Sequence, residues 1–139
     1  MNSYLFSELK VGTKESFDVT ITQDMMDSFR TITGDINPLH NDESYAIKRG
    51  YHGAVCFGML TASLLSTLAG VYLPGEHCLI QEVDTKFVKP VYIGDHLTVV
   101  GEVIETNDTV KQAVVKAVIK NQEDQKVLRA KMKVGFTNE

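Results

Sequence analysis

The sequence predicts an α+β fold in which an antiparallel sheet wraps around one long central helix. Residues 57–69 are apolar or small on every face, which is typical of a helix surrounded by protein. From residue 79 onward, apolar side chains recur at every second position, which is typical of strands with one buried face. A sheet whose apolar face covers a single apolar helix satisfies both elements.

The first strand and the first helix are predicted near the start of the chain. Residues 14–21 alternate between polar and apolar side chains, as a half-buried strand does. Thr22 is a suitable N-cap for the helix that follows, and Gly34 is placed to end it. The expected apolar stripe of this helix consists of Met25, Phe29 and Ile32.

A loop and a short helix are predicted next. The residue before a proline avoids the α conformation, so the pair Asn37-Pro38 favours a loop over residues 34–40. Asn41 or Asp42 can cap a short second helix over residues 43–48.

The second half of the chain is predicted to be the sheet. Gly70 and Pro74-Gly75 are expected to end the central helix, and alternating runs follow over residues 79–88, 97–103, 110–120 and 128–136. In the last run, one face consists of Leu128, Ala130, Met132, Val134 and Phe136, and the other of Arg129, Lys131 and Lys133. Such a sheet leaves edges open, and pairing with a second copy of the chain would close one of them.

Composition limits the classes of function. The 139 residues suit one domain, residues 1–139, with 43% hydrophobic and 23% charged side chains. The formal charge is 14 − 18 = −4, which does not favour nucleic acid. The first sixteen residues lack the apolar run of a secretory signal, and Cys56 and Cys78 form no CxxC motif, so we expect a reduced, cytoplasmic protein.

One segment has the length of a membrane span. Residues 53–75 carry no charge. They contain four glycines, a proline and several hydroxyl side chains, and their continuous apolar part, residues 57–69, is too short to cross a bilayer. We therefore expect a buried helix and no membrane partner.

The stretch GDINPLH, residues 34–40, places an acid and an imidazole five residues apart on a predicted loop. An imidazole titrates near neutrality, and a carboxylate beside it in a dry cleft can exchange protons with it, so Asp35 and His40 are candidate acid–base groups. Asn37 can orient either group by hydrogen bonding. Taken singly, an Asp after a helix-ending glycine is more often a turn residue, and a lone His is more often a hydrogen-bonded structural group.

The same stretch does not fit a metal site or a hydrolase nucleophile. A calcium loop that begins at Asp35 would need an oxygen ligand, a glycine and a glutamate where Leu39, His40 and Ala46 stand. The other histidines follow no zinc spacing, so no metal and no cofactor are expected. The chain has no GxSxG, and Cys56 has no obvious catalytic partner.

Three ordered blocks resemble a known family. An aromatic residue, Phe29, then TGDINPLH and then Ala46 resemble the signature of the R-specific enoyl-CoA hydratases, which are MaoC-like dehydratases. Downstream, FGMLTASLLSTLAGVYLPG resembles the central-helix segment of that family, and KFVKPVYIGDHLTV resembles its strand pair. The resemblance covers residues 10–136.

This resemblance implies a hot-dog fold and a reaction. Members hydrate trans-2-enoyl thioesters to (R)-3-hydroxyacyl thioesters or run the reverse dehydration, usually as dimers. By resemblance, Asp35 and His40 hold and activate the water, and the backbone N–H of Gly58 receives the charge on the thioester oxygen. The resemblance also places Asn37, Phe57 and Ser63 near the substrate, although a helix-packing hydroxyl is an alternative role for Ser63.

The chain departs from the family at one position. Many members carry His before the glycine, where this chain has Phe57. The donor is a backbone group and does not depend on that imidazole, but any contribution of the imidazole itself is lost. The predicted function is that of a hydro-lyase which acts on an acyl-CoA or acyl-carrier thioester. The protein is expected to form a homodimer or a multiple of dimers. The alternatives are a hot-dog thioesterase and a non-catalytic acyl-binding subunit.

Overall fold

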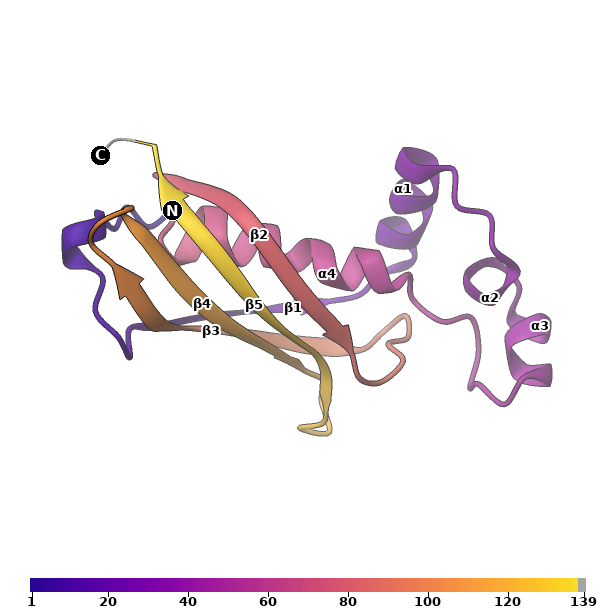
Figure 1. The fold of residues 1–139 in the computed structure, drawn as a ribbon. Coiled ribbons are helices and arrows are strands. Elements are labelled where there is room, and N and C mark those ends of the chain that lie inside the picture. Colours follow the sequence, from indigo (N-terminus) through magenta and orange to yellow (C-terminus); the bar gives the residue numbers. More distant parts are fainter. Residues whose placement is uncertain (138–139) are drawn as a thin grey trace.

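The computed structural model describes residues 1–137 as a curved sheet with a helix against one face and a helical lobe beyond one end (Figure 1). In chain order, the elements are a 3-10 turn η1 (Phe6–Glu8), β1 (Lys14–Thr20), α1 (Gln23–Thr33), α2 (Pro38–Asn41), α3 (Glu43–Lys48), α4 (Gly58–Thr67), a π-helical turn η2 (Leu68–Tyr72), β2 (Cys78–Phe87), β3 (His96–Asn107), β4 (Gln112–Lys120) and β5 (Lys126–Phe136).

The sheet is antiparallel and five-stranded, in the order β1-β3-β4-β5-β2. Its side chains alternate as the sequence predicts: along β5, Leu128, Met132 and Val134 are buried while Arg129 and Lys131 are exposed. The long pairing of β3, β4 and β5 builds one continuous apolar face. The order leaves β1 and β2 as the edge strands.

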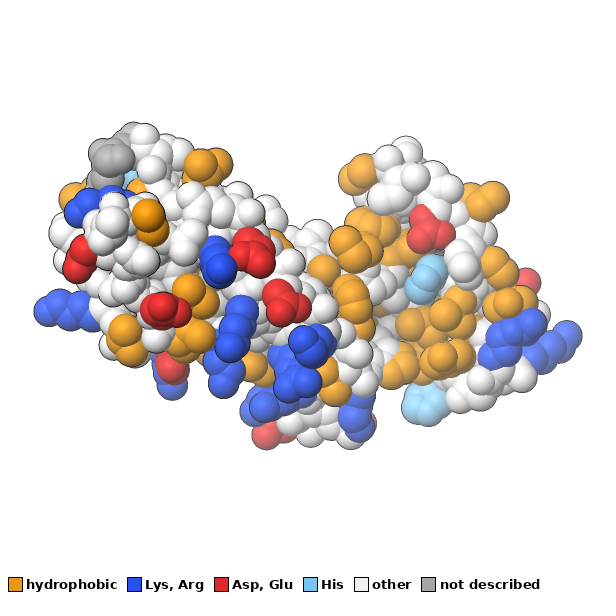
Figure 2. Space-filling view, viewed as in Figure 1, with side chains coloured by type: hydrophobic (Ala, Val, Ile, Leu, Met, Phe, Trp, Pro, Cys, Tyr) orange, Lys and Arg blue, Asp and Glu red, His pale blue; other side chains and the backbone are white. Residues whose placement is uncertain are grey.

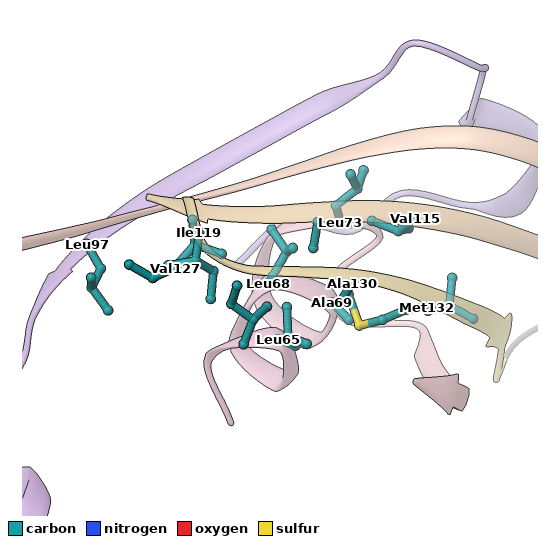
Figure 3. Packing of buried hydrophobic residues seen from close by; sticks show 14 of the residues in the cluster. Leu65, Leu68, Ala69, Leu73, Leu97, Val115, Ile119, Val127, Ala130 and Met132 are labelled. Carbon is teal, nitrogen blue, oxygen red and sulfur yellow. The ribbon is translucent and has the colours of Figure 1, made fainter. Parts of the chain in front are cut away.

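The core lies between this apolar face and the central helix (Figure 3). Leu65 of α4 and Leu68 and Ala69 of η2 are at most 2% exposed, and they pack against buried strand residues such as Ile119 and Met132. The predicted α+β hot-dog arrangement, with a sheet wrapped around a central helix, is therefore confirmed.

Two details of the central helix differ from the prediction. Gly70 does not end it, because the chain widens into the π-helical turn η2 and stays helical to Tyr72, so that the helix stops just before the predicted Pro74-Gly75 signal. It is also not surrounded by protein in the single chain: Ser63 and Ser66 are exposed, and Met59 is 64% exposed. The sheet covers only one side of α4, so the other side is left open.

The helical lobe follows the predicted boundaries with two corrections. Thr22 caps α1 by accepting the N–H of Met25, and Gly34 ends α1 in the left-handed conformation, φ 72°. Ile32 does not join the packed stripe, since it is 80% exposed. The predicted loop over residues 34–40 is shorter, because Pro38 starts the one-turn helix α2.

The connections of the lobe position the candidate site residues. Asp42, and not Asn41, caps α3 by accepting the N–H of Tyr45. After α3 the chain returns toward the sheet, where the N–H of Val55 donates to the carbonyl of Leu39 and the N–H of Cys56 donates to that of Val91. These two bonds tie the segment just before α4 to the lobe on one side and to the chain between β2 and β3 on the other.

Candidate active site

The N-terminus of α4 presents two free backbone donors. Phe57 is the N-cap residue and offers no side-chain acceptor. Among the described residues, neither the Gly58 N–H nor the Met59 N–H has a hydrogen-bond partner, whereas those of Leu60 and Thr61 both donate to the Phe57 carbonyl. Since a helix N-terminus carries partial positive charge, these donors favour a developing negative charge in front of them.

His40 faces the same place from α2. Its Nδ1 lies 2.7 Å from the carbonyl oxygen of Val55, and because a carbonyl can only accept, Nδ1 donates. In a neutral imidazole, Nε2 is then the unprotonated nitrogen and can accept a proton. The ring packs 4.6 Å from the ring of Phe57, which is 1% exposed and fixes its orientation.

Asp35 comes directly after the end of α1. Its Oδ1 accepts the backbone N–H of Asn37 at 3.0 Å, a bond that closes a tight turn. The second carboxylate oxygen has no partner among the described residues. Asp35 therefore acts as a turn residue through one carboxylate oxygen, and its second carboxylate oxygen remains available for a ligand.

A cavity of about 370 Å³ brings these groups together. Asp35, His40, Phe57 and Gly58 line it, with Phe29, Thr33, Met59 and Phe87 completing the walls. No hydrogen bond joins Asp35 to His40 within residues 1–137, but both side chains line this one cavity. A carboxylate, an imidazole and a free backbone N–H that line one cavity suit a substrate that gains negative charge while a proton moves.

A second hollow of about 240 Å³ adjoins the cavity, since His40, Gly58 and Phe87 line both. Its walls are mainly apolar and include Val55, Val91 and Val127. Cys56 also lines it, and burial raises the pKa of its thiol to about 11. A thiol that stays protonated near neutral pH is a poor nucleophile, so Cys56 does not supply one.

Two predicted site residues lie outside the cavity. The side chain of Asn37 is used as the cap of α2, where Oδ1 accepts the Leu39 N–H at 2.9 Å. Ser63 is exposed, and its hydroxyl donates to the Leu60 carbonyl at 2.6 Å. Five residues along a helix correspond to a rotation of about 140°, so Ser63 points away from the face that Gly58 presents.

Other lining residues were not predicted as site residues. Thr33 and Met59 lack any motif of their own. Phe87 lies closest to the donor group: a Cβ on Gly58 would lie 3.2 Å from its ring. Phe87 stands in the KFVKPV block that marks the strand pair, and this position is the only signal that could have identified it.

Neither a metal centre nor a membrane span is found in the described part of the chain. In residues 1–137, no group of three or more His, Cys, Asp or Glu side chains is placed to hold a metal ion. No helix in that range is long and apolar enough to cross a membrane.

Known proteins resemble this chain in both sequence and fold. The 3-hydroxybutyryl-CoA dehydratase of Methylorubrum extorquens is 35% identical over 100 residues, which are 72% of this chain and 64% of that protein. The (R)-specific enoyl-CoA hydratase of Rhodospirillum rubrum is 33% identical over 95 residues, which are 68% and 66% of the two chains. The matched regions thus span just under two thirds of both relatives.

A solved structure agrees over a longer range. R-hydratase PhaJ1 from Pseudomonas aeruginosa superimposes with a TM-score of 0.89 at 28% identity, covering 96% of this chain and 86% of that one. The model of the MaoC like domain matches residues 7–126, which include the whole lobe, α4 and most of the sheet. The chain therefore belongs to the MaoC-like domain family.

Proposed function

We propose that the protein adds water to trans-2-enoyl thioesters to give (R)-3-hydroxyacyl thioesters, or catalyses the reverse dehydration. The observation that carries the proposal is the single cavity lined by Asp35, His40 and Gly58. The names of the two relatives, a dehydratase and a hydratase of CoA thioesters, support the same reaction.

The groups present can perform each step. Water needs a base, for which Nε2 of His40 and the free oxygen of Asp35 are available. The water oxygen bonds to C3 of the enoyl group, and electrons of the double bond move toward the thioester oxygen. The N–H of Gly58 receives the charge that builds on this oxygen. The proton taken from water passes through the Asp35–His40 pair to C2, so the atoms balance without a cofactor.

The remaining predicted site residues receive different roles. Phe57 holds the His40 ring and forms part of the cavity wall. Asn37 acts through its cap on α2, which carries His40, and is a positioning residue. Ser63 is proposed at most as a residue that contacts the outer part of the substrate, since its side chain is exposed.

We also propose an assembly and a location for the protein. We propose that residues 1–139 form one domain that pairs with a second copy through edge strand β2, where Leu79, Val83 and Phe87 are 53%, 47% and 54% exposed. The two cysteines are free, as a reducing compartment allows, and we propose a cytoplasmic location.

The reaction is tested with crotonyl-CoA, whose conjugated enoyl thioester absorbs in the ultraviolet. We expect the enoyl band to disappear without release of a free thiol and the product to be the (R)-3-hydroxy isomer. Release of thiol would instead identify a thioesterase. An unchanged band together with measurable binding of the thioester would identify the non-catalytic binding subunit.

A further inference from the structure

We propose that the outer face of the sheet is a docking surface for an acidic carrier domain that brings the acyl group on a phosphopantetheine arm. We define this surface, the basic face, by Lys86, Lys116, Arg129 and Lys131. The inference deepens the proposed function and rests on it, because it names the partner that delivers the thioester.

The basic face is a shallow hollow with an excess of cations. Its four basic side chains, which are all exposed, line a hollow of about 390 Å³ together with a single carboxylate, Asp84. The chain as a whole has a formal charge of −4, so this face opposes the net charge of the molecule. Figure 2 shows Lys and Arg side chains gathered over the strands that face the viewer.

The strand register places like charges directly opposite one another. Lys116 of β4 is the register partner of Lys131 of β5, and Lys86 of β2 is the partner of Arg129 of β5. Like charges at opposed positions destabilise a sheet. Two such pairs side by side oppose folding, and an anionic partner would relieve the repulsion.

Nearby carboxylates do not neutralise the basic face. Glu102 stands opposite Lys116 in the register but forms an ion pair with Lys14 at 3.3 Å. Asp84 stands opposite Lys131 but lies 3.8 Å from the ammonium of Lys86. Within residues 1–137, Lys116, Arg129 and Lys131 therefore have no carboxylate at ion-pair distance.

The shape of the basic face favours a macromolecule. It extends over three adjacent strands, β4, β5 and β2, about 10 Å across at ordinary strand spacing. Small ligands are usually bound in concave, mainly apolar pockets, whereas charged and nearly flat surfaces steer protein partners. A protein with an acidic surface fits this chemistry better than a free nucleotide.

The basic face also leads to the candidate active site. Lys86 directly precedes Phe87, which lines both cavities beside Gly58. Just beyond it, the N–H groups of Val88 and Lys89 both donate to the carbonyl of Val127, and Lys89 and Val127 line the second hollow. An arm from a carrier docked on the basic face would enter that hollow around the end of the sheet.

The test compares one acyl group on three carriers. Crotonyl thioesters of an acidic acyl carrier protein, of CoA and of uncharged N-acetylcysteamine are hydrated by the wild type and by the Lys116→Gln/Lys131→Gln variant. The control is Lys10→Gln/Lys48→Gln, which removes the same charge from two exposed lysines elsewhere. The thermal midpoint checks folding, and the first variant should not be less stable because a repulsive pair is removed.

We expect kcat/KM for the carrier-protein thioester to fall about tenfold in the first variant only, with an unchanged value for N-acetylcysteamine. Added salt should lower the wild-type value for the carrier-protein thioester more than that of the variant. An equal fall for CoA would overturn the inference in favour of a site for small phosphates, and an unchanged value for the carrier protein would overturn it outright. If no thioester is hydrated, the proposed function fails, and calorimetric binding of the carrier protein to the same variants decides the docking separately.

Discussion

At the scale of residues, the proposed mechanism depends on how each candidate group is held. His40 is fixed by a bond from Nδ1 to the Val55 carbonyl and by the Phe57 ring, so the position of its free nitrogen is set by two separate contacts. The Gly58 N–H is free because it begins a helix, and it is accessible because glycine has no side chain. The Asp–His spacing in the sequence pointed to the two candidate groups, but not to these supports, which come from Val55 and Phe57, 15 and 17 positions after His40.

The first prediction concerns the space around Gly58. Its φ is not positive, so alanine is allowed by the backbone, but the new Cβ would lie 3.2 and 3.3 Å from two ring atoms of Phe87. We expect Gly58→Ala to displace the ring or the thioester and to lower turnover about 10²–10³-fold, as loss of an oxyanion donor does. Turnover and thermal midpoint are measured on the same preparation.

Two further variants test whether a loss of turnover in Gly58→Ala comes from crowding against the Phe87 ring. Gly70→Ala is the matched control, because nothing lies within 4 Å of its new Cβ. In Gly58→Ala/Phe87→Leu, a smaller neighbour should restore part of the activity. A folded Gly58→Ala protein with wild-type turnover would remove Gly58 from the mechanism.

The second prediction concerns the two thiols. Burial raises the pKa of Cys56 and of Cys78 from the ordinary 9.0 to about 11. The unfolded thiols therefore release their protons first, so the stability gained from keeping them neutral is present below pH 9.0 and is lost as the pH rises toward about 11. Urea unfolding across this range should show a decline that is smaller in Cys56→Ala/Cys78→Ala, and equal declines would refute the assignment.

At the scale of elements, the short helices were the least predictable, and one of them, α2, carries His40. The alternation in β5 and the caps Thr22 and Gly34 are local signals, so the strands and α1 were predicted correctly. Helix α2 has four residues, and its formation depends on the Asn37 cap and on the contact of the Leu39 carbonyl with Val55. The second contact joins distant parts of the chain and leaves no periodic signal.

The third prediction tests that cap. Asn37→Ala removes the acceptor of the Leu39 N–H, which typically costs about 1 kcal/mol of stability. Because α2 carries His40, we expect kcat to fall while KM changes little. Asn37→Asp keeps an acceptor oxygen at the same place and should retain most of the activity. If alanine and aspartate lower kcat equally, Asn37 acts on the substrate directly and not through the cap.

At the scale of the whole molecule, a single chain leaves part of its apolar surface uncovered. The open side of α4 exposes Met59, and edge strand β2 exposes Leu79, Val83 and Phe87. Phe87 and Met59 also line the candidate cavity, so this uncovered surface adjoins the site. The period of two predicted the sheet, but a sequence of one chain does not show which edge a second copy would cover.

The fourth prediction concerns assembly. Light scattering should give a mass of at least twice the 15.4 kDa of one chain at micromolar concentration. Val83→Lys places a charge on the exposed edge strand and should shift the protein toward monomers. Val110→Lys changes an equally apolar side chain, 60% exposed in the β3–β4 turn, and should leave the mass unchanged. A wild-type mass of 15.4 kDa would contradict the proposed pairing.

The central claim, that Asp35 and His40 act together on one water in front of Gly58, is tested most directly by crotonyl-CoA turnover of Asp35→Asn, His40→Ala and the double variant. Because acid–base groups typically contribute about 10²–10⁴-fold, each single variant should lose activity by that factor while its thermal midpoint stays near that of the wild type. The double variant should be little worse than either single one, since both groups serve the same proton transfer. Near wild-type turnover in either folded single variant would contradict the account.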